Sequence, residues 1–173
     1  MEFLELAKKR YSVRSFSKKP VEPEKLAAVL QAGRLAPTAT NAQPQRILVL
    51  QGQEEMQKLA ECTKFTFDAP MALVVCADKE QAWVRGHDGK NHAEIDACIV
   101  ATHMMLAAAE LGLGSTWVGV FQPERVAQTF GAPENFVITA ILPMGYPAED
   151  AKPSDRHEKR KPLEETVCYH SFS

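Results

Sequence analysis

Two arginines and a serine near the N-terminus are the residues of this sequence best suited to chemistry. They alternate along the segment Arg10-Tyr11-Ser12-Val13-Arg14. In an extended segment, side chains two residues apart point the same way, so both guanidinium groups and the hydroxyl can converge on one anion. Arginine suits planar, bidentate recognition of phosphate. The spacing therefore predicts a phosphate site, with an exposed basic turn as the alternative.

A second basic cluster, Arg156 to Lys161, lies near the C-terminus. Alone, a run of charges is usually a solvated surface. The sequence has no P-loop, and its only G-x-G, Gly112-Leu113-Gly114, follows a predicted helix, the reverse of a dinucleotide fingerprint. The second cluster is therefore a candidate to complete a phosphate site that lacks a glycine cradle.

Two further segments have unusual composition. The loop from Pro37 to Pro44 holds two threonines, Asn41 and Gln43, whose hydroxyl and amide groups can bind the edge of a heteroaromatic ring. Gly119 interrupts the extended segment 115–120, which indicates either a ligand that approaches the backbone closely or a β-bulge.

Metal and thiol chemistry have weaker signals. His87 and His92 lack a clear third ligand, so a solvated loop over 83–91 is the better interpretation, and no metal is predicted. His103 is interpreted as a packed helical histidine. The four cysteines show no CxxC and no regular spacing, which favours reduced thiols over disulfides.

Length and charge limit the classes of function. A chain of 173 residues predicts one domain, residues 1–173. Twenty Lys+Arg against 22 Asp+Glu give a net charge of −2, which argues against a nucleic-acid-binding surface. The sequence has no apolar stretch of 18 residues and no apolar N-terminal leader. We therefore expect a cytoplasmic protein without a membrane partner.

Hydrophobic periodicity predicts both helices and strands. Helices are expected at about 2–9, 24–35, 54–62, 92–111 and from Pro123 to Gly131, and extended segments at 11–17, 47–50, 71–77, 115–120 and 136–142. The unbroken apolar run 71–77 predicts a strand buried on both faces. Since the order is not a regular βαβ alternation, the fold class is α+β.

The longest predicted helix, 92–111, is apolar almost all round in its second half and should be the buried central helix. The residues that line one face at helical spacing are Ile95, Cys98, Ile99, Thr102, Met105, Leu106 and Ala109.

Five segments, in order along nearly the whole chain, match the motifs of a known family. They are residues 10–16, 36–44, 110–119, 143–147 and 160–165. On these segments the chain resembles the FMN-dependent nitroreductase family in its short form. Gln45 departs from relatives that place an aromatic residue there.

The resemblance implies a three-layer fold with a mainly antiparallel sheet flanked by helices. It implies an intertwined homodimer with two FMN sites at the subunit interface. Arg10, Ser12 and Arg160, with Lys159 or Lys161 nearby, would hold the phosphate, and Arg14 would lie near the ribityl chain and the N1/O2 edge. The other implied cofactor-binding residues are Tyr11, Pro37, Thr38, Ala39, Asn41 and Gln43 (in the loop that reaches the partner's flavin), Lys64, and Trp117, Val118 and Gly119 beneath the ring.

The implied activity is an NAD(P)H oxidoreductase that reduces nitroaromatics, quinones or similar planar electrophiles in a ping-pong cycle through flavin N5. The cofactor does the chemistry, so no catalytic acid or base is predicted, and Arg14 and Gly119 support it. A flavin store or redox sensor without turnover, and a same-fold enone reductase or dehalogenase, remain alternatives.

Overall fold

The computed structural model describes residues 2–172; Met1 and Ser173, the two ends of the predicted domain, lie outside the described residues. The five predicted helices and the strands predicted at 47–50, 71–77 and 136–142 are present, with their ends shifted by a few residues. The extended segment 11–17 forms only isolated bridges at Ser12 and Phe16, and 115–120 is reduced to a two-residue strand and a bridge at Val118. The elements are α1 (Phe3–Lys9), α2 (Pro23–Leu35), η1 (Ala39–Asn41), β1 (Gln45–Gln51), α3 (Gln53–Ala60), β2 (Met71–Asp78), α4 (Ala93–Glu110), β3 (Gly114–Ser115), α5 (Pro123–Phe130), β4 (Phe136–Gly145) and η2 (Leu163–Glu165).

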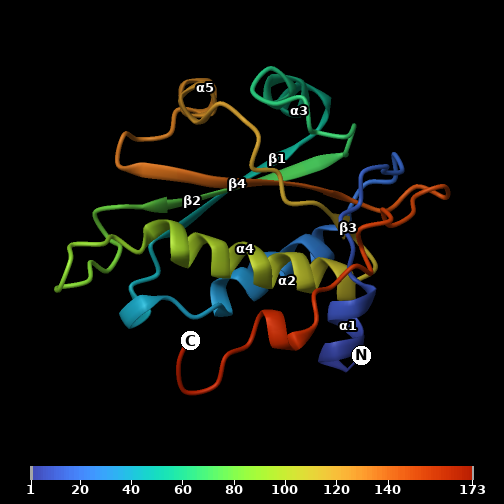
Figure 1. Cartoon of the computed structure of the whole chain (residues 1–173). Helices are drawn as coiled ribbons and strands as arrows, with labels where there is room; N and C mark the ends of the chain where they lie inside the picture. The colour runs from blue at the N-terminus through green and yellow to red at the C-terminus, as the bar shows by residue number, and fades with distance from the viewer. Residues whose placement is uncertain (1, 173) are drawn as a thin grey trace.

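The four strands form one antiparallel sheet in the order β1-β2-β4-β3. Helices α2 and α4 cover one face of this sheet, and α3 and α5 cover the other (Figure 1). The predicted α+β class and three-layer arrangement are confirmed. Among residues 2–172, no helix is both long enough and apolar enough to cross a membrane.

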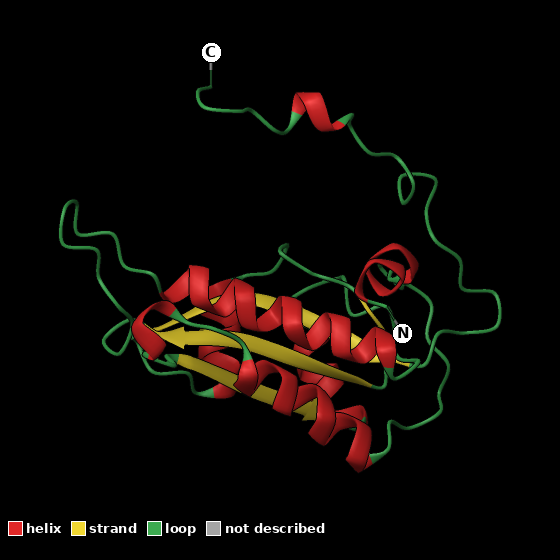
Figure 2. Cartoon of the chain, turned by 90° about the horizontal axis from the view of Figure 1, so that it is seen from below, coloured by secondary structure: helices red, strands yellow, loops and turns green. Residues whose placement is uncertain are grey.

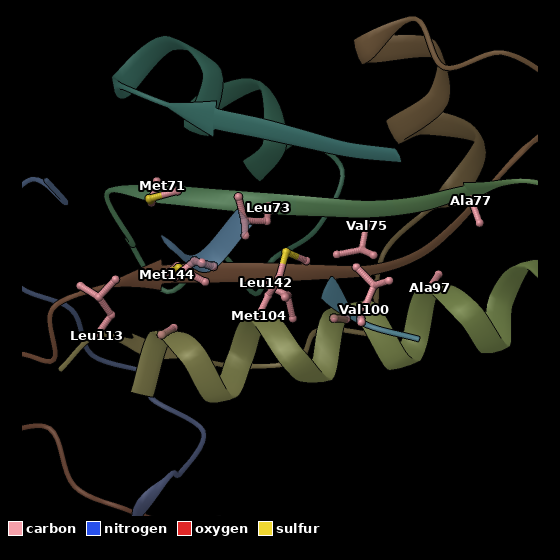
Figure 3. Packing of buried hydrophobic residues seen from close by; sticks show 14 of the residues in the cluster. Met71, Leu73, Val75, Ala77, Ala97, Val100, Met104, Leu113, Leu142 and Met144 are labelled. Carbon is pink, nitrogen blue, oxygen red and sulfur yellow. The ribbon is translucent and has the colours of Figure 1, made fainter. Parts of the chain in front are cut away.

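Strand β2 explains why a sheet with antiparallel strands has an unbroken apolar run. All eight of its residues are buried, because alternate side chains enter two different cores. One set packs against α4, as Figure 3 shows: Met71, Leu73, Val75 and Ala77. The other set packs toward α3 and α5: Ala72, Val74 and Cys76. The prediction of two-sided burial is confirmed.

Strand β4 corrects one predicted boundary. The prediction ended the strand at Leu142, before a proline, but β4 continues through Pro143 to Gly145. Pro143 is paired with Ala72 on β2, and its carbonyl accepts a bond from the Thr116 amide on the other side. Its missing N–H therefore faces the short strand β3, where the sheet needs no donor, so a proline is tolerated there.

Helix α4 corrects the predicted buried face. The helix is central, but its fully buried positions are Ala93, Asp96, Ala97, Val100, Ala101, Met104 and Ala108. The predicted face, Ile95, Cys98, Ile99, Thr102, Met105, Leu106 and Ala109, is only partly buried, with Thr102 exposed. Small residues let α4 approach the sheet closely. Of the predicted face, Ile99 and Met105 pack against the border of this core, whereas Ile95, Cys98 and Leu106 lie outside it.

Tyr146, directly after β4, joins three elements through its hydroxyl group. The hydroxyl donates a 2.6 Å hydrogen bond to Glu22 and accepts one of 2.7 Å from Lys25, which also donates to the Leu111 carbonyl. Lys19 forms a 3.0 Å ion pair with Glu22. These bonds hold the start of α2, the end of α4 and the segment after β4 together.

We expect this network to make the free energy of unfolding depend on pH in the acidic range. The bond from Tyr146, then bonds from the backbone of Glu22 and from Lys19, lower the pKa of Glu22 from 4.5 to about 2. A carboxyl group whose pKa falls on folding stabilises the folded state above pH 4.5, and that contribution is lost as the pH falls toward 2. In urea unfolding, the wild type should lose stability more steeply across this range than Glu22→Gln. Parallel pH dependences would contradict the expectation.

Candidate functional site

The two basic clusters of the sequence meet at one pocket. It has a volume of about 240 Å³, and its lining combines four guanidinium groups, a histidine and three hydroxyl groups. No carboxylate is among the lining residues, which are Arg10, Tyr11, Ser12, Arg14, Ser154, Arg156, His157 and Arg160. Such a concentration of donors and positive charge fits an anion. We call it the anion pocket.

A strand-like pairing positions the N-terminal half of the anion pocket. Ser12 forms a parallel bridge with Ser115, and the Val13 amide donates a 3.1 Å hydrogen bond to the Ser115 carbonyl. The Val13 side chain is buried. Alternation along the extended segment then leaves Ser12 and Arg14 on the opposite side, at the pocket.

The C-terminal half is held by a few contacts across the sequence. His157 Nε2 lies 3.0 Å from the carbonyl oxygen of Lys8, and the ring of His157 contacts the ring of Tyr11 edge to face. The Tyr11 hydroxyl donates a 3.3 Å bond to the Ala151 carbonyl. Arg160 enters the pocket, whereas the neighbouring Lys159, although predicted with it, does not line it.

Sequence reasoning singled out the cluster that contains Arg156 but did not assign Ser154, Arg156 or His157 to the phosphate site. The signal for Arg156 was its place in the same basic run as Arg160. His157 lies in the same run. Ser154 gave no signal, because only the path of the chain back to α1 brings it to the pocket.

In the segment 117–119, the chain passes from a paired, buried residue, Val118, to an exposed glycine, Gly119. Val118 is buried, and its amide and carbonyl both pair with Ile141, at 2.9 and 3.1 Å. Gly119 is exposed, and a Cβ atom there would meet nothing nearer than Trp117 Nε1, at 4.0 Å. The register shift lies between β2 and β4, at Val75/Cys76, so the irregularity is in that strand pair and not in the segment of Gly119 itself. The open face at Gly119 therefore suits the close approach of a flat molecule.

Lys64 lies beside this segment. The hydroxyl of its neighbour Thr63 donates a 2.6 Å hydrogen bond to the Val120 carbonyl, and Lys64 itself is exposed. The structure thus brings Lys64 near the 117–120 backbone, as the resemblance expects, although the lysine does not line the anion pocket.

The loop 37–43 lies at the other end of α4. The Ala39 amide donates a 3.0 Å hydrogen bond to Asp96, in the first turn of α4, whereas the anion pocket is built beside Ser115, beyond the last turn. An 18-residue helix is about 27 Å long. Figure 1 shows this separation between η1 and α1. Within one chain, Pro37, Thr38, Ala39, Asn41 and Gln43 therefore do not meet the anion pocket.

A larger hollow, of about 820 Å³, lies between α3 and residues 66–71. None of the predicted site residues lines it, and its charged lining residues are one lysine and one aspartate, Lys18 and Asp68. The larger volume alone therefore does not make this hollow the candidate functional site.

Gly114 links the fold to the anion pocket and supplies a test. A Cβ atom at Gly114 would lie 2.5 to 2.9 Å from three side-chain atoms of Val13, so the Arg10–Arg14 segment would have to move. We expect Gly114→Ala to lower the stability by about 1–3 kcal/mol and to weaken the binding of inorganic phosphate. Thermal unfolding and phosphate titration measure both. Gly86→Ala, where an added Cβ meets nothing, is the control; equal behaviour of the two variants would contradict the expectation.

The chain is similar to known proteins over most of its length. The family model described as the nitroreductase family matches residues 7–64 and 60–146. A crystal structure of a nitroreductase family protein from Clostridium difficile 630 is 47% identical, with a TM-score of 0.93, over 99% of this chain and 100% of that one. An FMN-dependent nitroreductase from Clostridium difficile R20291 is 27% identical, with a TM-score of 0.82, over 98% and 100%. An NADH dehydrogenase from Thermus thermophilus is 31% identical over 94% of this chain and 93% of its own.

Proposed function

The chain belongs to the nitroreductase family, and from this premise we propose that it is an FMN-dependent oxidoreductase. It takes electrons from NADH or NADPH and delivers them to a planar electrophile such as a nitroaromatic compound or a quinone. The observation that supports this most is the anion pocket, with four guanidinium groups and no carboxylate. It lies at the β3 edge of the sheet, along which the backbone of Gly119 is also exposed.

The residues present fit the two chemically different parts of FMN. The phosphate matches the anion pocket, where the guanidinium groups of Arg10 and Arg156 make no hydrogen bond to a protein acceptor among residues 2–172 and so are free to bind it. The flat ring matches the segment 117–119, because a residue with a side chain at Gly119 would fill the space beside the backbone. The resemblance assigns Arg10, Ser12 and Arg160 to the phosphate, and we add Arg156, whose free guanidinium lines the same pocket.

When bound, FMN would supply the hydride and electron transfer between the nicotinamide and the acceptor. The protein's own residues bind and orient the cofactor. Arg14 extends the positive charge of the anion pocket toward the ring, and a fixed guanidinium there stabilises negative charge that develops at the pyrimidine edge. The backbone at Gly119 leaves one side of the site open for the donor and the acceptor in turn.

The separation of the loop 37–43 from the anion pocket supports a homodimer. If two copies pack their α4 helices antiparallel about a two-fold axis, the start of one helix lies beside the end of the other. The loop of one protomer then reaches the anion pocket of its partner. The partly exposed apolar face of α4, which includes Ile95, Cys98 and Leu106, is the surface that such packing would bury.

The C-terminal tail supports the same arrangement. Residues 158–172 are exposed throughout and run away from the sheet and its helices (Figure 2). Leu163 and Tyr169 are 72% and 81% exposed. Apolar side chains that find no core in their own chain indicate a surface on a second copy. We therefore propose that the tail packs on the partner subunit.

The test is the visible spectrum of the purified protein before and after anaerobic addition of NADH and then NADPH. We expect a flavin spectrum that bleaches with at least one nucleotide. A flavin that stays oxidised with both would support a store or sensor instead. A colourless protein that binds no added FMN would overturn the proposal.

A further inference from the structure

The loop that contains Thr38 to Gln43 has an unfavourable backbone. Thr40, Asn41 and Gln43 have φ values of +53°, +57° and +52°, in the left-handed region that glycine prefers. Non-glycine residues keep such conformations only when the surrounding structure imposes them, and they concentrate at functional sites. Something must therefore hold the loop in this shape.

Most hydrogen bonds of this loop join residues within the loop. The Thr38 hydroxyl accepts a bond from the Gln43 amide, and the Thr38 carbonyl accepts one from the Asn41 amide. Considering the described residues 2–172, Arg46 on β1 donates a 3.5 Å bond to the Gln43 carbonyl, and residues 38–42 make a single hydrogen bond to another element. It is the 3.0 Å bond from the Ala39 amide to Oδ1 of Asp96.

Asp96 is an unusual residue for its position. It is 1% exposed, on the α4 face where its neighbours Ala93, Ala97 and Val100 pack in the core. Its second oxygen, Oδ2, is buried and makes no hydrogen bond to residues 2–172. A buried carboxylate with a free oxygen is costly, even with the favourable dipole of the helix start. An apolar residue there would simply extend the core, so a structural role alone does not account for the aspartate.

We propose that Asp96 is a positioning residue for flavin binding. Its carboxylate holds the Ala39 amide, and thereby the loop 38–43, in the shape that contacts the FMN of the partner subunit. Asp96 itself does not touch the cofactor. This inference rests on the proposed function, because it assumes that the loop of one protomer serves the anion pocket of the other.

The first test separates the hydrogen bond from the charge. We expect Asp96→Ala to weaken FMN binding about tenfold, since a hydrogen bond to a charged group is lost. Asp96→Asn keeps an oxygen that can accept from the Ala39 amide and should restore affinity to within about threefold. FMN fluorescence quenching measures the dissociation constant without any turnover. Asp88→Ala, which removes an exposed carboxylate that pairs with Arg85, is the matched control.

A second variant removes the donor and leaves the core intact. Thr38 is extended, at φ −130° and ψ 156°, which is the conformation that a following proline requires, and Ala39 begins the turn η1, where a proline φ is allowed. Ala39→Pro deletes the amide hydrogen that Asp96 accepts. We expect a loss of FMN affinity comparable to that of Asp96→Ala, even if the alanine variant folds poorly.

The last test asks which flavin the loop serves. Asp96→Ala and Arg10→Ala protomers are purified with different tags, mixed after partial unfolding, and refolded. In a mixed dimer, one site then combines an intact anion pocket from one protomer with an intact loop from the other. We expect wild-type FMN affinity to return at about a quarter of all sites. A loop that served its own chain would restore none.

The outcomes distinguish this inference from the proposed function. If the wild type binds FMN but neither Asp96→Ala nor Ala39→Pro changes its affinity, the positioning role is wrong and the proposed function stands. If Asp96→Asn binds as weakly as Asp96→Ala, the hydrogen bond is not the cause. A wild type that binds no FMN would overturn the proposed function itself.

Discussion

Replacing Arg14 with alanine is expected to weaken FMN binding and also to slow reduction of the bound flavin by the nicotinamide. Arg10→Ala is expected to weaken binding alone. Both guanidinium groups line the same pocket, but the resemblance assigns Arg10 to the phosphate and Arg14 to the pyrimidine edge. A charge at the phosphate favours every redox state of the cofactor equally, whereas a charge at the pyrimidine edge favours the state that gains negative charge.

The expected changes in FMN affinity and in reduction rate follow from these two roles. Each variant loses charge-assisted hydrogen bonds, so the dissociation constant should rise about tenfold or more. At saturating FMN, Arg10→Ala should be reduced at the wild-type rate, and Arg14→Ala more slowly by about tenfold or more. Stopped-flow absorbance under anaerobic conditions measures the rate. Arg85→Ala, which removes an arginine paired with Asp88 outside the pocket, should change neither quantity. Equal reduction rates for Arg14→Ala and wild type would refute the role given to Arg14.

A negative charge on the outer face of α4 is expected to produce a monomer that does not retain FMN. Leu106 lies on this face, and the core formed by α4 and the sheet does not include it. If the face is the dimer interface, Leu106→Glu places an unpaired carboxylate in an apolar contact, which is strongly unfavourable. Because the proposed flavin site includes the loop 37–43 of a second protomer, loss of the dimer should also lower FMN affinity.

Light scattering gives the oligomeric state, and FMN titration gives the affinity of the same samples. Gln57→Glu adds the same charge to α3, on the opposite face of the sheet, and should remain a dimer that binds FMN (Figure 1). The result that contradicts the expectation is a Leu106→Glu protein that is still dimeric, or a monomer that binds FMN as tightly as the wild type.

The sequence by itself determined the local features of this protein. The run 71–77 predicted a strand buried on both faces, because only a strand covered by helices on each side tolerates apolar side chains in both directions. Pro23 and Gly131 marked the start of α2 and the end of α5, where their backbone preferences are satisfied. The alternation of Arg10, Ser12 and Arg14 predicted one side of the anion pocket. These signals depend on neighbours in the chain, which the sequence displays directly.

Only the tertiary structure decided how the distant segments meet. The face of α4 was predicted wrongly because the helix is apolar nearly all round, so periodicity does not choose a side; the small residues that allow close packing on the sheet do. His157 reaches the anion pocket through contacts to Lys8 of α1 and to Tyr11 that no spacing encodes. The role of Asp96 depends on a hydrogen bond across 57 residues of sequence. Such contacts are set by the packing of helices on a sheet, and packing distance is unrelated to distance along the chain.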